Sequence, residues 1–136
     1  MNLKFHHVAF TVKDIQKSSK WYVDALNFKI IEDYKNNDLE IVLLQLSDIR
    51  IELISFGKNT KDLPEYRSNI IHDIHTIGTK HLCMEVDNLD ESIKQLKAKG
   101  VVFVTELDTA AFGGKYIFFK DCDNILIELY QGNKKL

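Results

Sequence analysis

Two short phrases with chemical potential occur twice in this chain. The hexapeptide at residues 7–12, His-Val-Ala-Phe-Thr-Val, recurs at residues 81–86 as His-Leu-Cys-Met-Glu-Val. The tripeptide Ile-Glu-Leu at residues 51–53 recurs at residues 127–129. Each half of the chain therefore supplies one histidine and one glutamate at matching places.

The four repeated polar residues are His7, Glu52, His81 and Glu128, and their spacing is nearly the same in the two halves. The histidine and the glutamate lie 45 residues apart in the first half and 47 apart in the second. Two imidazoles and two carboxylates are a suitable ligand set for one divalent metal ion. The sequence predicts such a metal site, shared between two copies of a small module.

Strand parity indicates where these side chains point. Residues two apart in a strand share a face, so Val8, Phe10 and Val12 form one apolar face and His7 lies on the other. The same parity separates each of the other three candidates from its apolar neighbours. If the apolar faces pack against helices, all four candidates point away from the helix layer. A curved sheet would then gather them into one cavity.

Simpler interpretations exist for each polar residue alone. A single histidine or glutamate in a strand is most often the solvent-facing member of a half-buried strand, and the joint recurrence is what favours a site. His6 lies on the opposite face from its neighbour and is interpreted as a packing or surface residue. His72 and His75 have helical ligand spacing but fall in a connector, which favours a solvated loop. Cys83 either borders the candidate site or is a small hydrophobic residue of the core. Cys122 lies in a predicted turn and is assigned no function.

The hydrophobic pattern of the first half predicts a β-α-β-β-β order. Asp14 is a good N-cap, and the apolar spacing after it predicts a helix that ends near Asn27. Alternating runs predict strands at residues 5–12, 28–34, 39–46 and 49–56.

A shift of 74 residues reproduces this pattern in the second half, which indicates an internal repeat. Asn88 and Glu91 form a capping-box pattern at the start of the second helix, and Gly100 is suited to its C-terminal end. Strands are predicted at residues 101–105, 115–120 and 125–131, with a flexible loop at residues 108–114.

The chain of 136 residues is long enough for one domain with its own core. We predict an α+β fold of two βαβββ modules in one domain, residues 1–136. Module one spans about residues 3–57 and module two about residues 79–132. The connector between them, about residues 58–78, holds the only proline and is predicted to contain a helical turn around residues 63–71.

Composition excludes several classes of function. The net charge is −2 and the lysines are scattered, so a nucleic-acid partner is not expected. No apolar run approaches the roughly 20 residues that span a bilayer, and the first residues lack a signal-peptide pattern. Two cysteines without CxxC spacing fit a reducing compartment, so we expect a soluble cytoplasmic protein. Nucleophile elbows and glycine-rich phosphate loops are also absent from the sequence.

The chain resembles the vicinal oxygen chelate superfamily, which includes glyoxalases, bleomycin resistance proteins and extradiol dioxygenases. The resemblance extends from His7 to Gln131. It rests on residues 7–14, on Trp-Tyr-Val-Asp-Ala-Leu at residues 21–26, and on the closing residues 118–129. It implies that the paired βαβββ modules form an open, cup-shaped sheet around a divalent metal ion.

Carried over by position, the resemblance makes all four repeated polar residues metal ligands. His7 and His81 match the first-strand ligands, and Glu52 and Glu128 match the last-strand ligands. The departures are in turns: Asp-Cys-Asp-Asn at residues 121–124 stands where Asp-Pro-Asp-Gly is common, and Asn27 stands where glycine is usual.

The ligand set implies a branch of the family and a mechanism. The glutamate at position 52 favours the glyoxalase I type over the three-ligand oxygenases, and over methylmalonyl-CoA epimerases, which typically have glutamine there. The implied enzyme is a lyase or isomerase that moves a proton next to a carbonyl through an enediolate on the metal. Glu128 is the expected base and Glu52 the second acid or base.

The metal is Ni, Zn, Co, Mn or Fe, a choice that the sequence leaves open. The expected partners are a small-molecule substrate and a second copy of the chain in a homodimer, and no independent thiol-binding signature identifies the substrate. The alternatives are an Fe(II)-dependent dioxygenase that uses His7, His81 and Glu128, and a non-enzymatic protein that binds a small molecule or an antibiotic.

Overall fold

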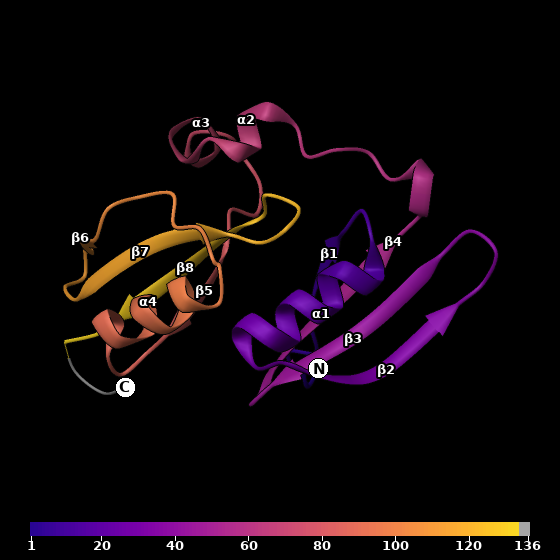
Figure 1. The fold of residues 1–136 in the computed structure, drawn as a ribbon, viewed down its shortest axis with the longest axis horizontal. Coiled ribbons are helices and arrows are strands. Elements are labelled where there is room, and N and C mark those ends of the chain that lie inside the picture. The colour runs from indigo at the N-terminus through magenta and orange to yellow at the C-terminus, as the bar shows by residue number, and fades with distance from the viewer. Residues whose placement is uncertain (134–136) are drawn as a thin grey trace. The chain divides into compact units, whose positions relative to one another are not determined.

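Two four-stranded mixed sheets, each packed against a helix, make up the fold (Figure 1). The structure is a computed structural model that describes residues 1–133. It contains two compact units, Met1–Asp62 and a second unit that begins at Leu63. The predicted α+β class and the two βαβββ modules are confirmed. No helix in the described part of the chain is long and apolar enough to cross a membrane.

The sheet of the first unit has the strand order β1-β4-β3-β2. Strand β1 runs parallel to β4, and the other neighbours are antiparallel. Helix α1 contacts β2, β3 and β4. The elements are β1 (Val8–Thr11), α1 (Ile15–Leu26), β2 (Lys29–Lys35), β3 (Glu40–Leu46) and β4 (Ile49–Ser55).

Helix α1 forms where its caps and its apolar spacing predicted. The Asp14 carboxylate accepts a hydrogen bond from the backbone N–H of Lys17 at 3.0 Å, which satisfies one of the free donors of the first turn. The predicted core positions of the helix are buried, and Tyr22 is completely so. Asn27 ends the helix in the left-handed conformation, with φ of 62°. Strand β1 is shorter than predicted, since its ladder begins at Val8 rather than Phe5.

The sheet of the second unit has the corresponding order β5-β8-β7-β6, with β5 parallel to β8. Asn88 caps α4 through its side chain, which accepts a hydrogen bond from the backbone N–H of Glu91 at 3.0 Å. The elements of this sheet unit are β5 (Leu82–Glu85), α4 (Leu89–Ala98), β6 (Asp108–Thr109), β7 (Lys115–Lys120) and β8 (Leu126–Gln131).

The prediction of a strand at residues 101–105 is wrong. Phe103 makes only an isolated bridge to Phe119, and the third strand of the module is the two-residue β6. The physical reason lies at Thr105, whose hydroxyl accepts a hydrogen bond from the backbone N–H of Phe118 at 3.0 Å. A side chain that takes the place of a backbone acceptor interrupts the ladder. Residues 108–114, predicted as a flexible loop, instead form β6 and a turn into β7.

The turn between β6 and β7 depends on Gly114, and this dependence gives a testable prediction. Gly114 has φ of +82°, and a Cβ atom there would lie 2.3 Å from the backbone oxygen of Gln131. Gly100 also has φ of +82°, but a Cβ atom there would meet open space. We expect Gly114→Ala to lower the free energy of unfolding by about 1 kcal/mol or more beyond Gly100→Ala, because only the former adds a clash to the strained φ. Urea unfolding followed by circular dichroism measures both, and equal losses would contradict the clash.

The connector is more structured than a single helical turn. It contains the short 3₁₀ helix η1 (Gly57–Asn59), α2 (Glu65–Ser68) and α3 (Ile70–Ile74). The helical segment predicted around residues 63–71 is thus present, and it continues three residues further.

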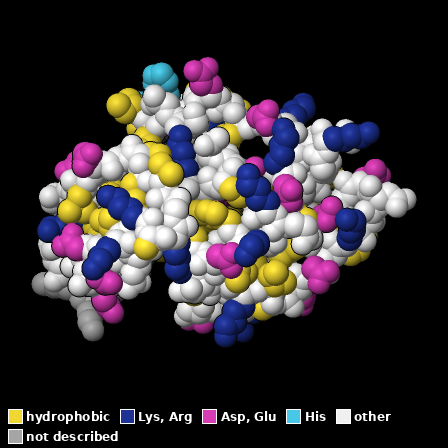
Figure 2. Space-filling model, viewed as in Figure 1, with side chains coloured by type: hydrophobic (Ala, Val, Ile, Leu, Met, Phe, Trp, Pro, Cys, Tyr) yellow, Lys and Arg dark blue, Asp and Glu magenta, His cyan; other side chains and the backbone are white. Residues whose placement is uncertain are grey.

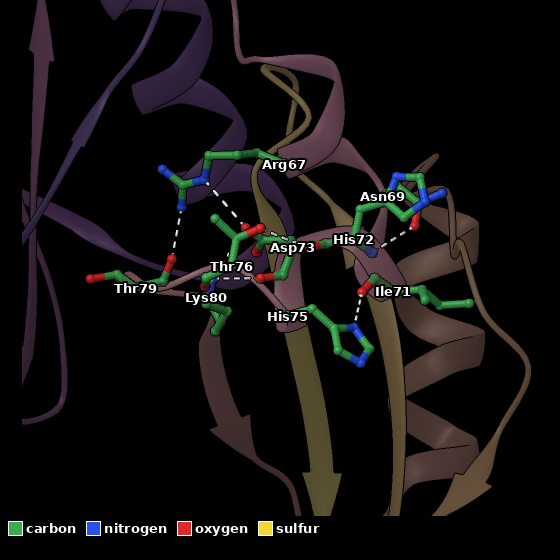
Figure 3. A network of polar contacts seen from close by, with 9 residues as sticks. All are labelled: Arg67, Asn69, Ile71, His72, Asp73, His75, Thr76, Thr79 and Lys80. Carbon is green, nitrogen blue, oxygen red and sulfur yellow. Dashed lines mark hydrogen bonds and ion pairs between the residues drawn. The ribbon is translucent and has the colours of Figure 1, made fainter.

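A buried carboxylate ties the connector helices to the chain just before β5 (Figure 3). Asp73 is only 3% exposed, and its Oδ1 lies 3.3 Å from Lys80 Nζ and 3.6 Å from Arg67 Nε. Arg67 also donates from Nη2 to the backbone oxygen of Thr79 at 2.8 Å. A buried carboxylate requires such partners. The network therefore fixes the segment that leads into β5.

Charged side chains of both signs are interspersed over the face of the molecule in Figure 2, with apolar side chains visible between them. This pattern agrees with the net charge of −2. The face in view presents no broad area of a single sign among the described residues.

Candidate functional site

The first unit brings His7 and Glu52 together. His7 immediately precedes β1, and Glu52 lies on β4, the parallel neighbour of β1. His7 Nε2 lies 3.8 Å from Glu52 Oε2, and both side chains are half-buried. The alternate residues Ile51 and Leu53 are fully buried in the core. Strand parity thus correctly placed Glu52 on the face opposite the core.

The second unit brings His81 and Glu128 together more closely. His81 immediately precedes β5, and Glu128 lies on β8, the parallel neighbour of β5. His81 Nε2 lies 2.7 Å from Glu128 Oε2. The ring of Phe118 contacts the His81 ring edge-on, with 4.9 Å between the centroids. The aromatic contact and the short polar contact together fix the orientation of the imidazole.

The repeat extends to the register of the strands. Ala9 is the β1 partner of Glu52, and Cys83 is the β5 partner of Glu128. Ala9 and Cys83 each follow their candidate histidine by two residues. The two modules therefore present a histidine and a glutamate from the same positions of the same local framework.

His6 has a contact that its sequence position did not predict. Its Nδ1 lies 2.7 Å from Nδ1 of His7, with one nitrogen donating to the other, and the two rings meet edge-on. The second nitrogen of His7, Nε2, is the one near Glu52. A hydrogen bond at one ring nitrogen orients the other, which is how protein metal sites commonly position histidines. His6 is an exposed residue that orients a candidate ligand.

Cys83 borders the second pair, as one of the two interpretations of its position predicted. Burial of the thiol, followed by repulsion from the Glu128 carboxylate, raises the pKa of Cys83 to about 12. The thiol is therefore protonated at neutral pH, and it can donate a weak hydrogen bond to the carboxylate.

The connector histidines His72 and His75 are exposed and take part in local helix contacts. The backbone N–H of His72 donates to the side chain of Asn69, and His75 Nδ1 lies 2.7 Å from the backbone oxygen of Ile71 (Figure 3). These contacts agree with the interpretation of the segment as a solvated connector.

Two neighbours of the pairs were missed at the level of sequence. Phe118 was read only as a strand residue, although it is the β7 partner of Glu128. Arg50 precedes Glu52 by two residues and shares its strand face. The signal for Arg50 was available, because the parity that placed Glu52 also applies to the residue two positions before it.

The donor chemistry of the two pairs fits a divalent metal ion. Imidazole nitrogens and carboxylate oxygens suit Zn, Ni, Co, Mn and Fe. Within either unit, no third His, Cys, Asp or Glu of residues 1–133 joins a pair in an arrangement that holds a metal. Each unit thus supplies half of the predicted ligand set, and the four-ligand site stays a prediction.

The chain is similar to enzymes that act on different substrates. It is 28% identical to mitochondrial methylmalonyl-CoA epimerase from Mus musculus over 134 residues, which cover 94% of this chain and 72% of that protein. It is also 28% identical to lactoylglutathione lyase from Schizosaccharomyces pombe, over 93% of this chain but only 46% of that protein.

A solved structure and a family model both relate this chain to glyoxalase family proteins. A glyoxalase family protein from Enterococcus faecalis has a crystal structure that matches this one with a TM-score of 0.79, at 25% identity, over 93% of this chain and 96% of that chain. The model of the Glyoxalase/Bleomycin resistance protein/Dioxygenase superfamily matches residues 4–129. The βαβββ repeat, its paired His and Glu positions and this match lead to one conclusion: the chain belongs to the Glyoxalase/Bleomycin resistance protein/Dioxygenase superfamily.

Proposed function

We propose that this protein is a divalent-metal-dependent lyase or isomerase of the glyoxalase I type, which moves a proton at a carbon next to a carbonyl. The observation that supports the proposal most is the repeated His–Glu pair, presented twice from the same strand register. The similarity to an epimerase and to a lyase supports the same class, because both relatives belong to one superfamily with this chain.

In this proposal His7, Glu52, His81 and Glu128 supply the ligands of one divalent metal ion. The ion supplies Lewis-acid stabilisation of the negative charge that develops on the carbonyl oxygen. The two histidines would bind the ion through Nε2, the nitrogen that faces a carboxylate in each pair. His6 and Phe118 hold the imidazoles in these orientations.

Glu128 is the proposed base. Its carboxylate takes the proton from the substrate carbon, and the electron pair of the broken C–H bond moves toward the carbonyl to give an enolate, which is an enediolate when that carbon carries a hydroxyl group. Glu52 is the second acid or base. Once it has taken a proton from the substrate hydroxyl group or from water, it delivers a proton to the adjacent carbon or to the opposite side of the same carbon. Return to the adjacent carbon gives an isomerase or lyase of the glyoxalase I type, and return to the same carbon gives an epimerase.

An epimerase of an acyl-CoA is the second candidate, favoured by the extent of the match to the methylmalonyl-CoA epimerase, 72% of which is covered. Glu52 favours the first candidate, since the resemblance places glutamine there in epimerases. The two candidates share the site and the first chemical step, so one experiment tests both.

The experiment compares purified protein, chelator-treated protein and protein reloaded with Ni, Zn, Co, Mn or Fe. The substrates are the hemithioacetal of methylglyoxal and glutathione, followed as thioester formation, and methylmalonyl-CoA in deuterated water, followed as deuterium gain by mass spectrometry. We expect turnover of one substrate, loss of turnover with chelation and recovery with at least one metal. Oxygen-dependent conversion of a catechol instead would favour the dioxygenase. Inactivity with both substrates, with tight binding of one that survives metal removal, would favour a binding protein.

A further inference from the structure

Arg50 lies beside the first His–Glu pair, on the same face of β4 as Glu52. The two side chains are half-buried and alternate with the fully buried Ile51 and Leu53. Same-face neighbours in a strand are about 7 Å apart along the chain. A group bound by Arg50 would therefore lie within the length of a small molecule from Glu52.

The Arg50 guanidinium is already oriented. Gln45 is its partner across the β3–β4 ladder, and Arg50 Nε donates to Gln45 Oε1 at 3.3 Å. Gln45 is itself anchored, because its Nε2 donates to the backbone oxygen of Ser47 at 2.9 Å. The amide oxygen thus engages Nε of Arg50 and leaves the positive charge of the guanidinium unneutralised.

No carboxylate among residues 1–133 forms an ion pair with Arg50. Some lysines of the same unit have such a partner, as Lys13 has Asp62 at 2.7 Å and Lys35 has Glu40 at 3.2 Å. A half-buried cation has a desolvation cost that an anion offsets. The two terminal nitrogens of Arg50 are therefore available to an anionic group of a ligand.

The surroundings favour a carboxylate as that group. Strands β1, β3 and β4 contain no lysine or arginine other than Arg50. The nearest lysine in the ladder is Lys29 of β2, which lies one strand further away, on the other side of Gln45. A single planar guanidinium matches a planar carboxylate with two parallel hydrogen bonds, whereas one cation only partly neutralises a phosphate dianion. The position of the charge next to Glu52 makes the substrate of the proposed reaction the appropriate ligand.

We infer that Arg50 binds a carboxylate of the substrate beside the reacting carbon, so that the substrate is a small organic acid or its thioester with a free carboxylate. This inference rests on the proposed function for the identity of the ligand. The anion-binding step itself does not require turnover and is tested separately.

The test uses the Nε–H signals of the two arginines in the chain, observed by ¹⁵N–¹H nuclear magnetic resonance of the purified protein. Loss of one signal in Arg50→Lys assigns it. We expect propionate to move the Arg50 signal saturably and to leave the Arg67 signal in place. Propionamide, which has the same shape without the charge, is expected to have no effect, and inorganic phosphate a weaker one. The inference is overturned if Arg50 does not respond, if both arginines respond equally, or if phosphate is the stronger ligand.

A second experiment measures the kinetics of turnover in two variants. Arg50→Gln is expected to raise KM for methylmalonyl-CoA, the assay substrate with a free carboxylate on the reacting carbon, by about 10- to 100-fold, the value of a lost charge-assisted hydrogen bond, with a much smaller change in kcat. Lys35→Gln removes the same charge from an exposed side chain of β2, which is paired with Glu40 of β3, and is expected to leave KM unchanged. Metal-dependent turnover with unchanged KM in Arg50→Gln would refute the inference and leave the proposed function intact. If the Arg50 signal responds to propionate but the protein turns over neither substrate, the anion-binding inference would stand and the proposed function would be refuted.

Discussion

Replacement of Glu128 by glutamine is expected to lower kcat by about 10²- to 10⁴-fold, the range for loss of a general base. The variant keeps the size of the side chain and one oxygen that can bind a metal, but it removes the carboxylate that accepts the proton. Glu128 is the more deeply buried of the two candidate carboxylates, with 16% of its side chain exposed against 26% for Glu52. Steady-state kinetics on whichever of the two assay substrates is turned over measures the effect.

The matched control is Glu85→Gln, which removes the same charge from the same face of β5 as Cys83. Glu85 is exposed and is expected to leave kcat within a few-fold of the parent. Metal content measured on both variants distinguishes a missing base from an empty site. Full turnover by Glu128→Gln would show that another group is the base.

Loss of the metal is expected when either pair is broken. Glu52→Ala in the first unit and His81→Ala in the second are each expected to reduce bound metal from one ion per chain to a small fraction. Removal of a group that only hydrogen-bonds to a metal ligand already weakens metal binding by about 10- to 100-fold, and removal of a direct ligand is expected to have a larger effect. Elemental analysis by inductively coupled plasma mass spectrometry after dialysis measures the stoichiometry.

His75→Ala is the control for the general effect of deleting a histidine, because His75 is exposed and bonded within the connector. It is expected to retain the ion. A stoichiometry that falls in only one of the two test variants would contradict a shared ion and would restrict the site to one module. Unchanged metal in both would refute the ligand set.

Local chemistry made most of the fold predictable. Asp14 and Asn88 cap helices through the hydrogen bonds that their positions predicted, and Asn27 ends the first helix in a left-handed conformation. Strand parity was equally informative, since the buried neighbours Ile51 and Leu53 place Glu52 on the opposite face. Caps and alternation act over a few residues, so the sequence expresses them directly.

The features that were missed depend on contacts between distant segments. Residues 101–105 have a strand pattern, but the hydroxyl of Thr105 takes the N–H of Phe118 and the regular ladder starts only at β6. The contact of Phe118 with His81 likewise requires the strand order β5-β8-β7. Packing between distant segments decides the structure at such positions, and the residue pattern along the chain carries no information about that packing.

The matching register of the two modules places different side chains beside the two glutamates. The proposed function gives the two glutamates different roles, whereas the repeated framework presents them from equivalent positions. Ala9 gives Glu52 a small, inert cross-strand neighbour, while Cys83 gives Glu128 a polarisable thiol that can donate to it. In the proposed function, the side chain at this one framework position would therefore help to make the carboxylates of Glu52 and Glu128 behave differently.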